Sequence, residues 1–233
     1  MTLAEMRSRV LRRLDEDDTS PVYYTKAEVE AMINRAHRLF AVLTLAPEKT
    51  GQIALSANQY AYDLPTLFPD LLVVLRASID GKKLRPGNLP SFSSANESWR
   101  AARGDPTYYA VAGYRRLFIT PAPTGSGLNM DVTYAYVPAL MTSDSATPSI
   151  PEPYHPYLID LAVPFLRVKE GGDELAGALG YLAAGMDGLA SLARRIAEMR
   201  RRPFYDQQPV ELDRRRLELL IREILTQAKP AVR

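Results

Sequence analysis

Hydrophobic residues recur at helical spacing in the first part of the chain. Within residues 2–16, the apolar positions that share one helical face are Leu3, Met6, Val10 and Leu14. A second stretch of helical periodicity starts after Thr25 and stops at Pro47. Each stretch opens with a capping-box pattern, Thr2-x-x-Glu5 and Thr25-x-x-Glu28, in which two side chains satisfy each other's free backbone N–H groups. The chain is therefore expected to begin with two amphipathic helices.

Helical spacing returns after residue 153. Residues 154–169 have Pro156 in the first turn and Pro164 where proline bends a helix, and residues 173–202 form a longer pattern that Pro203 ends. The glycines that weaken this long helix are Gly177, Gly180, Gly185 and Gly188. Each costs about 0.5–1 kcal/mol relative to Ala, so we expect them to permit close approach of a neighbouring helix, within one subunit or between subunits. A last amphipathic helix is predicted over residues 210–228.

The middle of the chain has the period of two that is typical of strands. Strands are predicted at residues 52–55, 60–63, 71–79, 82–84, 108–111, 116–120 and 130–137. Asp80-Gly81 predicts a hairpin turn, and residues 89–102, which include the single Trp99, predict a short helix. A loop rich in Ser, Thr and Pro leads back to the helical pattern.

This order of elements predicts an α+β fold. Residues 1–49 and 150–202 would form a helical bundle, residues 50–149 a β-rich insertion in the middle of the chain, and residues 203–233 an extended helical C-terminal tail.

Composition narrows the functional classes. The chain has no cysteine, which excludes disulfides, thiolate metal sites and cysteine nucleophiles. The first residues lack the pattern of a signal peptide, and no apolar run approaches the roughly 18 residues that span a bilayer, so a soluble protein made in the cytoplasm is expected. Charge is uneven: residues 1–190 hold 18 Lys and Arg against 21 Asp and Glu, and residues 191–233 hold 11 against 6. This split suggests that the tail has its own partner.

Candidate catalytic groups are few. The only histidines are His37, in an amphipathic helix where a surface or half-buried role is expected, and His155, in a turn before a helix. The acidic run 15–18 lacks the spacing of a calcium loop and is expected to be solvated. The Gly125-Ser126-Gly127 sequence lacks the Lys-Ser/Thr of a phosphate-binding loop and predicts a hairpin connection. No catalytic residue, cofactor or metal site is predicted.

Several turn and corner motifs follow one another in a fixed order. They are Thr25-x-x-Glu28 with Ile33-Asn34-x-Ala36, Tyr60-x-x-Asp63-Leu64-Pro65, Gly104-Asp105-Pro106-x-Tyr108, Ile119-x-Pro121-x-Pro123, Tyr134-x-Tyr136-x-Pro138-x-Leu140 and Ile150-Pro151-x-x-Tyr154-His155-x-x-Leu158. This order, over roughly residues 25–190, resembles the head-to-tail adaptor (connector) proteins of tailed bacteriophages.

The resemblance implies a structural virion protein at the head–tail interface, with no enzymatic activity. Such adaptors form a homo-oligomeric ring, generally dodecameric, which docks beneath the portal and continues the DNA channel toward the tail. The implied partners are the portal protein, a downstream tail protein, other copies of the chain and genomic DNA that passes without sequence-specific contact, and no membrane. Assembly would take place in the host cytoplasm.

In these adaptors a C-terminal segment commonly reaches the portal, and residues 203–233 would take that role. The expected portal-contact residues are Phe204, Tyr205, Leu212, Arg214, Arg215, Leu217, Leu220, Ile221, Ile224 and Leu225. Two alternatives stay open at this point. One is a cell-wall hydrolase that uses a carboxylate pair, and the other is a DNA-binding module that uses the C-terminal arginines.

Overall fold

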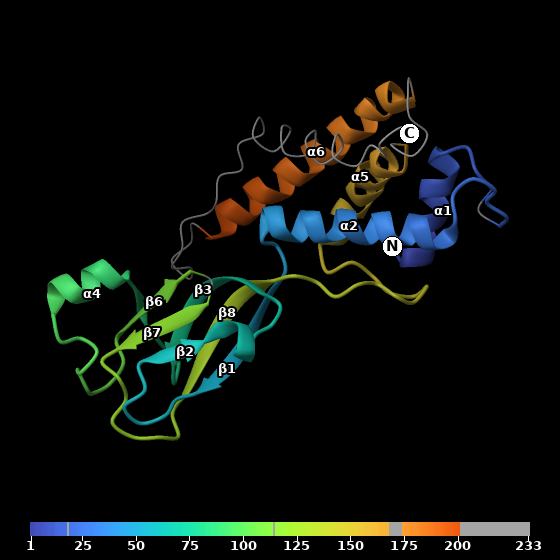
Figure 1. The fold of residues 1–233 in the computed structure, drawn as a ribbon. Coiled ribbons are helices and arrows are strands. Elements are labelled where there is room, and N and C mark those ends of the chain that lie inside the picture. Colours follow the sequence, from blue (N-terminus) through green and yellow to red (C-terminus); the bar gives the residue numbers. More distant parts are fainter. Residues whose placement is uncertain (18, 114, 168–173, 201–233) are drawn as a thin grey trace, which may run out of the picture. The chain divides into compact units, whose positions relative to one another are not determined.

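Helical segments precede and follow a β-rich segment, which confirms the predicted α+β class. The computed structural model describes residues 1–17, 19–113, 115–167 and 174–200, with residues 174–179 as backbone only. The described residues contain six α-helices and two β-sheets. They divide into two compact units (Figure 1). The first unit contains Met1–Ala46 and Pro138–Ala197, and the second contains Pro47–Val137 with the last residues of the final described helix.

Helices α1 (Leu3–Arg13) and α2 (Lys26–Thr44) begin where the capping boxes predict. The Glu5 N–H donates to Thr2 Oγ1 at 3.3 Å, and the Thr2 N–H donates to the Glu5 carboxylate at 3.0 Å. The same reciprocal pair forms at the start of α2. A capping residue contributes about 1 kcal/mol because it satisfies a backbone donor that the helix itself leaves open. Both helix starts are thus encoded by neighbouring residues.

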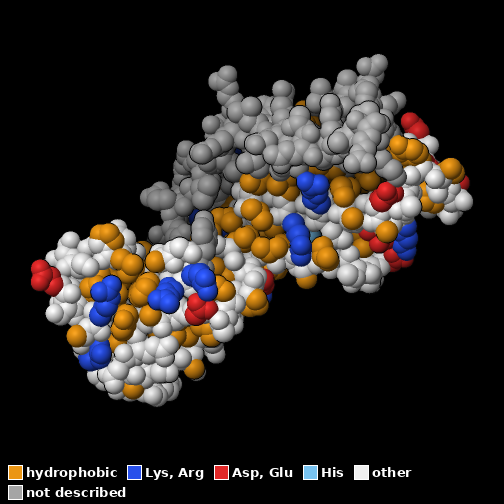
Figure 2. Space-filling model, in the orientation of Figure 1, with side chains coloured by type: hydrophobic (Ala, Val, Ile, Leu, Met, Phe, Trp, Pro, Cys, Tyr) orange, Lys and Arg blue, Asp and Glu red, His pale blue; other side chains and the backbone are white. Residues whose placement is uncertain are grey.

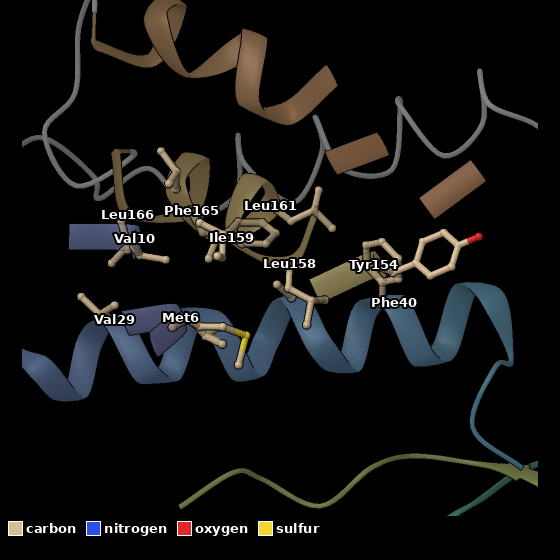
Figure 3. Close-up of a cluster of buried hydrophobic side chains, with 14 of the residues drawn as sticks. Met6, Val10, Val29, Phe40, Tyr154, Leu158, Ile159, Leu161, Phe165 and Leu166 are labelled. Atoms are coloured by element: carbon tan, nitrogen blue, oxygen red, sulfur yellow. The ribbon is translucent and has the colours of Figure 1, made fainter. Parts of the chain in front are cut away.

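The first unit has one hydrophobic core, to which α1, α2, α5 (His155–Arg167) and α6 (Glu174–Arg200) contribute. Figure 3 shows side chains of this core meeting between α2 and α5. The fully buried members include Met6, Val10, Val29, Ile33, Phe40, Leu158, Leu161 and Leu189. A one-turn 3₁₀ helix, Glu152–Tyr154, precedes α5. Pro164 lies buried inside α5 without ending the helix.

Two glycines of α6 lie directly against α5. A Cβ atom at Gly185 would stand 2.6 Å from Cγ of Leu161, and one at Gly188 would stand 2.0 Å from Cγ of Tyr157. Both distances are far below normal carbon–carbon contact, so only glycine permits this approach. At Gly180, by contrast, a Cβ would meet nothing within 4 Å. The predicted role of small residues is therefore confirmed within the chain at Gly185 and Gly188. Close approach to another subunit at Gly180 stays a prediction, and the side-chain surroundings of Gly177 are outside the described part of the chain.

The second unit consists of two four-stranded sheets. One has the order β1 (Glu48–Ala54), β8 (Asn129–Tyr136), β3 (Leu71–Ile79) and β4 (Lys82–Lys83). The other has the order β2 (Ala61–Asp63), β7 (Arg116–Thr120), β6 (Tyr108–Ala112) and β5 (Arg85–Pro86). Among these described strands, all pairings are antiparallel except that of β5 with β6. One hydrophobic core draws on both sheets, through residues such as Ile53, Val74 and Val132 from the first and Tyr109, Leu117 and Ile119 from the second.

Strand β8 shows why the alternating pattern was informative. Val132 and Tyr134, two positions apart, both lie in the shared core. Thr133 lies on the opposite side of the strand. Its hydroxyl is 3.0 Å from the Thr50 hydroxyl and accepts a hydrogen bond from Arg76 Nε. Since successive side chains of a strand point to opposite faces, one strand supplies both an apolar core and a polar ladder.

The predicted helix over residues 89–102 is wrong in length. Helix α4 covers only Leu89–Ala95, and Asn96 then bends the chain by accepting a hydrogen bond from the Ser98 N–H at 2.9 Å. Trp99 follows in a turn, where its ring packs edge-on against Tyr60 and Phe92. Burial of this large ring, which is 2% exposed, outweighs the helical periodicity of the segment. A second short helix, α3 (Leu64–Leu67), was not predicted.

Candidate interaction surfaces

A strap of residues 138–150 runs along the helices of the first unit. The Asn34 side chain, buried in α2, makes two hydrogen bonds to the backbone of Met141: Nδ2 donates to the carbonyl at 3.0 Å, and Oδ1 accepts from the N–H at 2.8 Å. One turn later, Arg38 Nε donates to the Pro138 carbonyl at 3.3 Å. These bonds satisfy polar backbone groups that would otherwise be buried unpaired, so they fix the path of the strap.

His37 holds the far end of the same strap. Its Nε2 accepts a hydrogen bond from the Ser149 N–H at 3.0 Å, which requires a neutral imidazole with its proton on Nδ1. Burial is the main reason that the pKa of His37 falls to about 4, and the nearby His155 adds to the effect. The ring is 2% exposed, so the expected surface or half-buried role is wrong. His37 is a structural residue of the core.

His155 also has a structural role, at the start of α5. Its Nε2 donates to the Ile150 carbonyl at 2.9 Å, and its Nδ1 accepts from the ammonium group of Met1 at 3.0 Å. Burial lowers the pKa of His155 below its usual value. Its expected place in a turn before a helix is confirmed, and both histidines are buried with at least one ring nitrogen hydrogen-bonded.

Charged side chains tie the middle of the strap to α1 and α2. Arg7 NH1 lies 2.6 Å from Glu30 and 2.8 Å from Asp144, and Lys26 lies 3.4 Å from Asp144. The Arg7 guanidinium holds the pKa of the Asp144 carboxyl below its usual value. In addition, the N–H groups of Leu3 and Ala4 donate to strap carbonyls at 2.8 and 3.1 Å. The first-turn donors of α1, which have no partner within the helix, are thereby satisfied by the strap.

The acidic loop between α1 and α2 is ordered by its own carboxylates. Glu16 accepts from the N–H groups of Val22 and Tyr23, each at 2.9 Å. Asp17 accepts from both the N–H and the hydroxyl of Thr19. The carboxylates therefore stabilise a turn, and among the described residues no group of three or more metal-ligating side chains is found.

Large apolar side chains are exposed at two places on the first unit. Val22 is 94% exposed and Tyr23 46% exposed, directly before α2. Val42, in the last turns of α2, is 44% exposed, and Leu140, in the strap, is 53% exposed. Single exposed apolar residues are normal on a protein surface, whereas several of them on one unit, beside charged side chains, suggest interaction sites.

The second unit also exposes apolar and basic groups. Its exposed large hydrophobic residues include Leu67 in α3 and Tyr108 in β6, and the Arg85 guanidinium lies 5.9 Å from the centre of the Tyr108 ring. Arg100 lies over the Trp99 ring at 4.9 Å. Figure 2 shows hydrophobic side chains interspersed with Lys and Arg on one face of the molecule. The described side chains of this face are therefore mixed in character rather than purely apolar or purely charged.

The C-terminal arginines are only partly described, because the described chain stops at Arg200. Arg200 is buried and binds the Glu48 carboxylate, with NH2 at 2.7 Å and Nε at 3.1 Å, both residues belonging to the second unit. Arg194 is exposed and lies near a backbone carbonyl of its own helix. Arg200 therefore forms a buried ion pair with Glu48 and has a structural role, so it is not available for contact with DNA.

The predicted portal-contact residues lie outside the described residues. They are Phe204, Tyr205, Leu212, Arg214, Arg215, Leu217, Leu220, Ile221, Ile224 and Leu225. Within the described helices, none has both the length and the continuous apolar character needed to cross a bilayer.

Comparison with known families identifies the chain. The family model described as SU10 adaptor protein matches residues 1–208. The chain belongs to the SU10 adaptor protein family. The match includes both compact units, the strap and the ordered motifs that resemble phage head-to-tail adaptors, so that resemblance is confirmed at the level of the family. A comparison with curated proteins gave no match. Adaptors of this kind are structural phage proteins, which supports the expectation that the chain is not an enzyme.

The structure also explains motifs whose role was not evident from the sequence. Ile33-Asn34-x-Ala36 combines two core residues with the side chain that holds Met141. In Ile150-Pro151-x-x-Tyr154-His155, the histidine donates to the carbonyl of the isoleucine that opens the motif. No local sequence pattern predicts that Asn34 binds the strap backbone, because its partner, Met141, lies 107 residues away in the chain.

Proposed function

We propose that the protein is a head-to-tail adaptor of a tailed-phage virion. It forms a homo-oligomeric ring of 12 copies beneath the portal and continues the DNA channel toward the tail. The observation that carries this proposal is the family match over residues 1–208. The protein assembles in the host cytoplasm, and it acts by making contacts with other proteins.

The two-unit organisation suits a ring subunit. A closed ring requires heterologous interfaces, which means two different patches on every copy. It also requires separate surfaces toward the portal and toward the next tail component. One helical unit and one two-sheet unit, each with its own hydrophobic core, supply chemically distinct surfaces for these contacts.

The C-terminal tail is the proposed portal contact. Residues 203–233 contain an apolar stripe with Leu217, Leu220, Ile221 and Ile224, flanked by arginines. An amphipathic helix of this kind binds an apolar groove through its stripe, while the charged side chains form the rim of the interface. The tail would thus attach the ring to the portal.

The decisive experiment is electron microscopy of the purified chain mixed with its portal. We expect rings bound to one end of the portal, with a channel that continues the portal channel. A folded chain that neither forms a ring nor binds the portal under these conditions would show that the proposal is wrong.

The tail is tested by a chain truncated after residue 202. We expect the truncated chain to keep the cooperative thermal unfolding of the full chain and to lose portal binding. If it unfolds without cooperativity, the tail belongs to the folded core. If it is folded and binds the portal as well as the full chain does, the contact lies elsewhere.

A further inference from the structure

The two exposed apolar sites of the first unit lie at opposite ends of one helix. Val22 and Tyr23 come directly before α2, and Val42 lies near its C-terminal end. Leu140 lies in the strap between Pro138, which Arg38 binds, and Met141, which Asn34 binds, and the strap thus runs beside the second half of α2. A helix of 19 residues is about 28 Å long, so the two sites are well separated along its axis.

The first site is an acidic knob, formed by Asp15, Glu16, Asp17, Val22 and Tyr23. Its backbone is held in place by the Glu16 carboxylate, which accepts from the N–H groups of Val22 and Tyr23. The adjacent Tyr24 is buried and contacts the Tyr23 ring edge-on at 4.9 Å. A valine that is 94% exposed is therefore presented on backbone that the Glu16 carboxylate holds in place.

The second site is a basic patch, formed by Arg35, Arg38, Val42 and Leu140. The three α2 residues recur at spacings of three and four, so they lie on one exposed face of the helix. Arg35 is held over the Phe165 ring at 4.9 Å, and Arg38 is held by the Pro138 carbonyl. Both guanidinium groups are thus held in place on the helix face that carries exposed Val42, and exposed Leu140 follows two residues after Pro138 in the strap.

The knob and the patch are complementary in apolar character and in charge. Each combines exposed apolar side chains with charges, and the charges have opposite sign. We propose that the acidic knob of one copy binds the basic patch of the next copy, and that this contact is the ring interface. The inference rests on the proposed function, since a head-to-tail contact between two different patches closes a ring or grows a filament. Opposite charges also exclude knob–knob and patch–patch pairing, because like charges repel.

The test uses cysteine cross-linking. The chain has no cysteine of its own, so only the introduced thiols can react. The variant Val22→Cys/Leu140→Cys carries one thiol in the knob and one in the patch. It is treated with a short bismaleimide under the conditions in which the wild-type chain forms rings, in solution or on portal particles. We expect a ladder of covalent dimers, trimers and larger products.

The single variants separate the possible interfaces. Val22→Cys and Leu140→Cys alone should give no product above the background of a control variant, Arg9→Cys, at an exposed position of α1. Mixed in equal amounts, the two single variants should give a heterodimer and nothing larger, because each covalent link needs one knob thiol and one patch thiol. Efficient homodimers of either single variant would indicate a two-fold interface and would overturn the proposal.

The salt dependence of the ladder tests the charge complementarity. The ladder should decrease at least severalfold when ionic strength is raised, because the charges of the interface lie near its solvent-exposed rim. A salt-insensitive ladder would refute the charge complementarity on which the head-to-tail orientation rests.

If wild-type rings form but the double variant gives no ladder, the inference is wrong while the proposed function stands. If the wild-type chain forms no ring even with its portal, the proposed function fails as well. A patch thiol that the monomer shields from maleimide would show that the chain's own residues cover the patch, which also contradicts the inference.

Discussion

The same substitution, Gly to Ala, should have opposite effects at two positions of helix α6. At Gly180 a new methyl group would meet nothing within 4 Å, so Gly180→Ala should only reduce the flexibility of the unfolded chain and favour the helix. This is worth about 0.5–1 kcal/mol of added stability. At Gly188 the methyl carbon would stand 2.0 Å from Cγ of the Tyr157 ring.

The clash at Gly188 exceeds the gain in helix propensity. The Tyr157 atoms nearest the new methyl are Cγ, Cδ1 and Cδ2, which belong to the base of the ring and move only with the whole side chain. Forcing an extra methyl into such a contact costs about 1–3 kcal/mol, and this short distance places Gly188→Ala near the upper end. After the propensity gain, the net loss of stability should be about 1–2 kcal/mol.

Thermal unfolding of the purified full chain, followed by far-UV circular dichroism, measures both effects. For a chain of this length, 1 kcal/mol shifts Tm by about 2–4 °C, so Gly188→Ala should lower Tm by about 3–6 °C and Gly180→Ala should raise it by about 2 °C. In a Tyr157→Ala background, Gly188→Ala should lose most of its cost. Gly188→Ala that is at least as stable as the parent chain would refute the close contact between α5 and α6.

Three other predictions follow from the described contacts. Asn34→Ala should cost about 3 kcal/mol in urea unfolding, because it leaves the buried backbone of Met141 without partners, and a control at an exposed position of α1, Arg9→Ala, should change stability by less than about 0.5 kcal/mol. For His37, the folded pKa of about 4 lies below the ordinary value of 6.5, so the unfolded state takes up the proton first on acidification. Stability should therefore fall by up to about 1.4 kcal/mol per pH unit as pH drops from 6.5 toward 4, and His37→Gln should have a shallower slope over that range; equal slopes would contradict the burial of a neutral ring. Trp99→Ala should cost about 3–5 kcal/mol, measured by denaturant unfolding, because the ring fills the space between Tyr60 and Phe92, and a loss below about 1 kcal/mol would contradict that packing.

Features that depend on neighbouring residues were predictable from the sequence. The start of α2 depends on Thr25 and Glu28, which are three positions apart and satisfy each other's backbone donors. The two faces of β8 follow from strict alternation along one strand. The α+β class followed from the order of these local patterns. The family resemblance also came from the sequence, through the order of its short motifs along the chain.

Other features depend on residues that are distant in the chain. Periodicity placed His37 on a helix but not in the core, because the Ser149 backbone that it holds is 112 residues away. Likewise, composition identified the glycines of α6 but not which of them contact Tyr157 and Leu161 of α5. Helical spacing over residues 89–102 was also overruled, since burial of the Trp99 ring gains more than another turn of exposed helix.

The candidate knob and patch illustrate the same division. The sequence by itself determined that an acidic run precedes a capped amphipathic helix and that arginines recur along that helix. Only the tertiary structure decided that Val22 is exposed and that the strap carrying Leu140 is held along α2, because burial depends on the whole packed chain and the bond from Arg38 to Pro138 joins residues 100 positions apart. Short-range hydrogen bonding and side-chain periodicity are encoded locally, whereas burial and partner choice are properties of the packed chain.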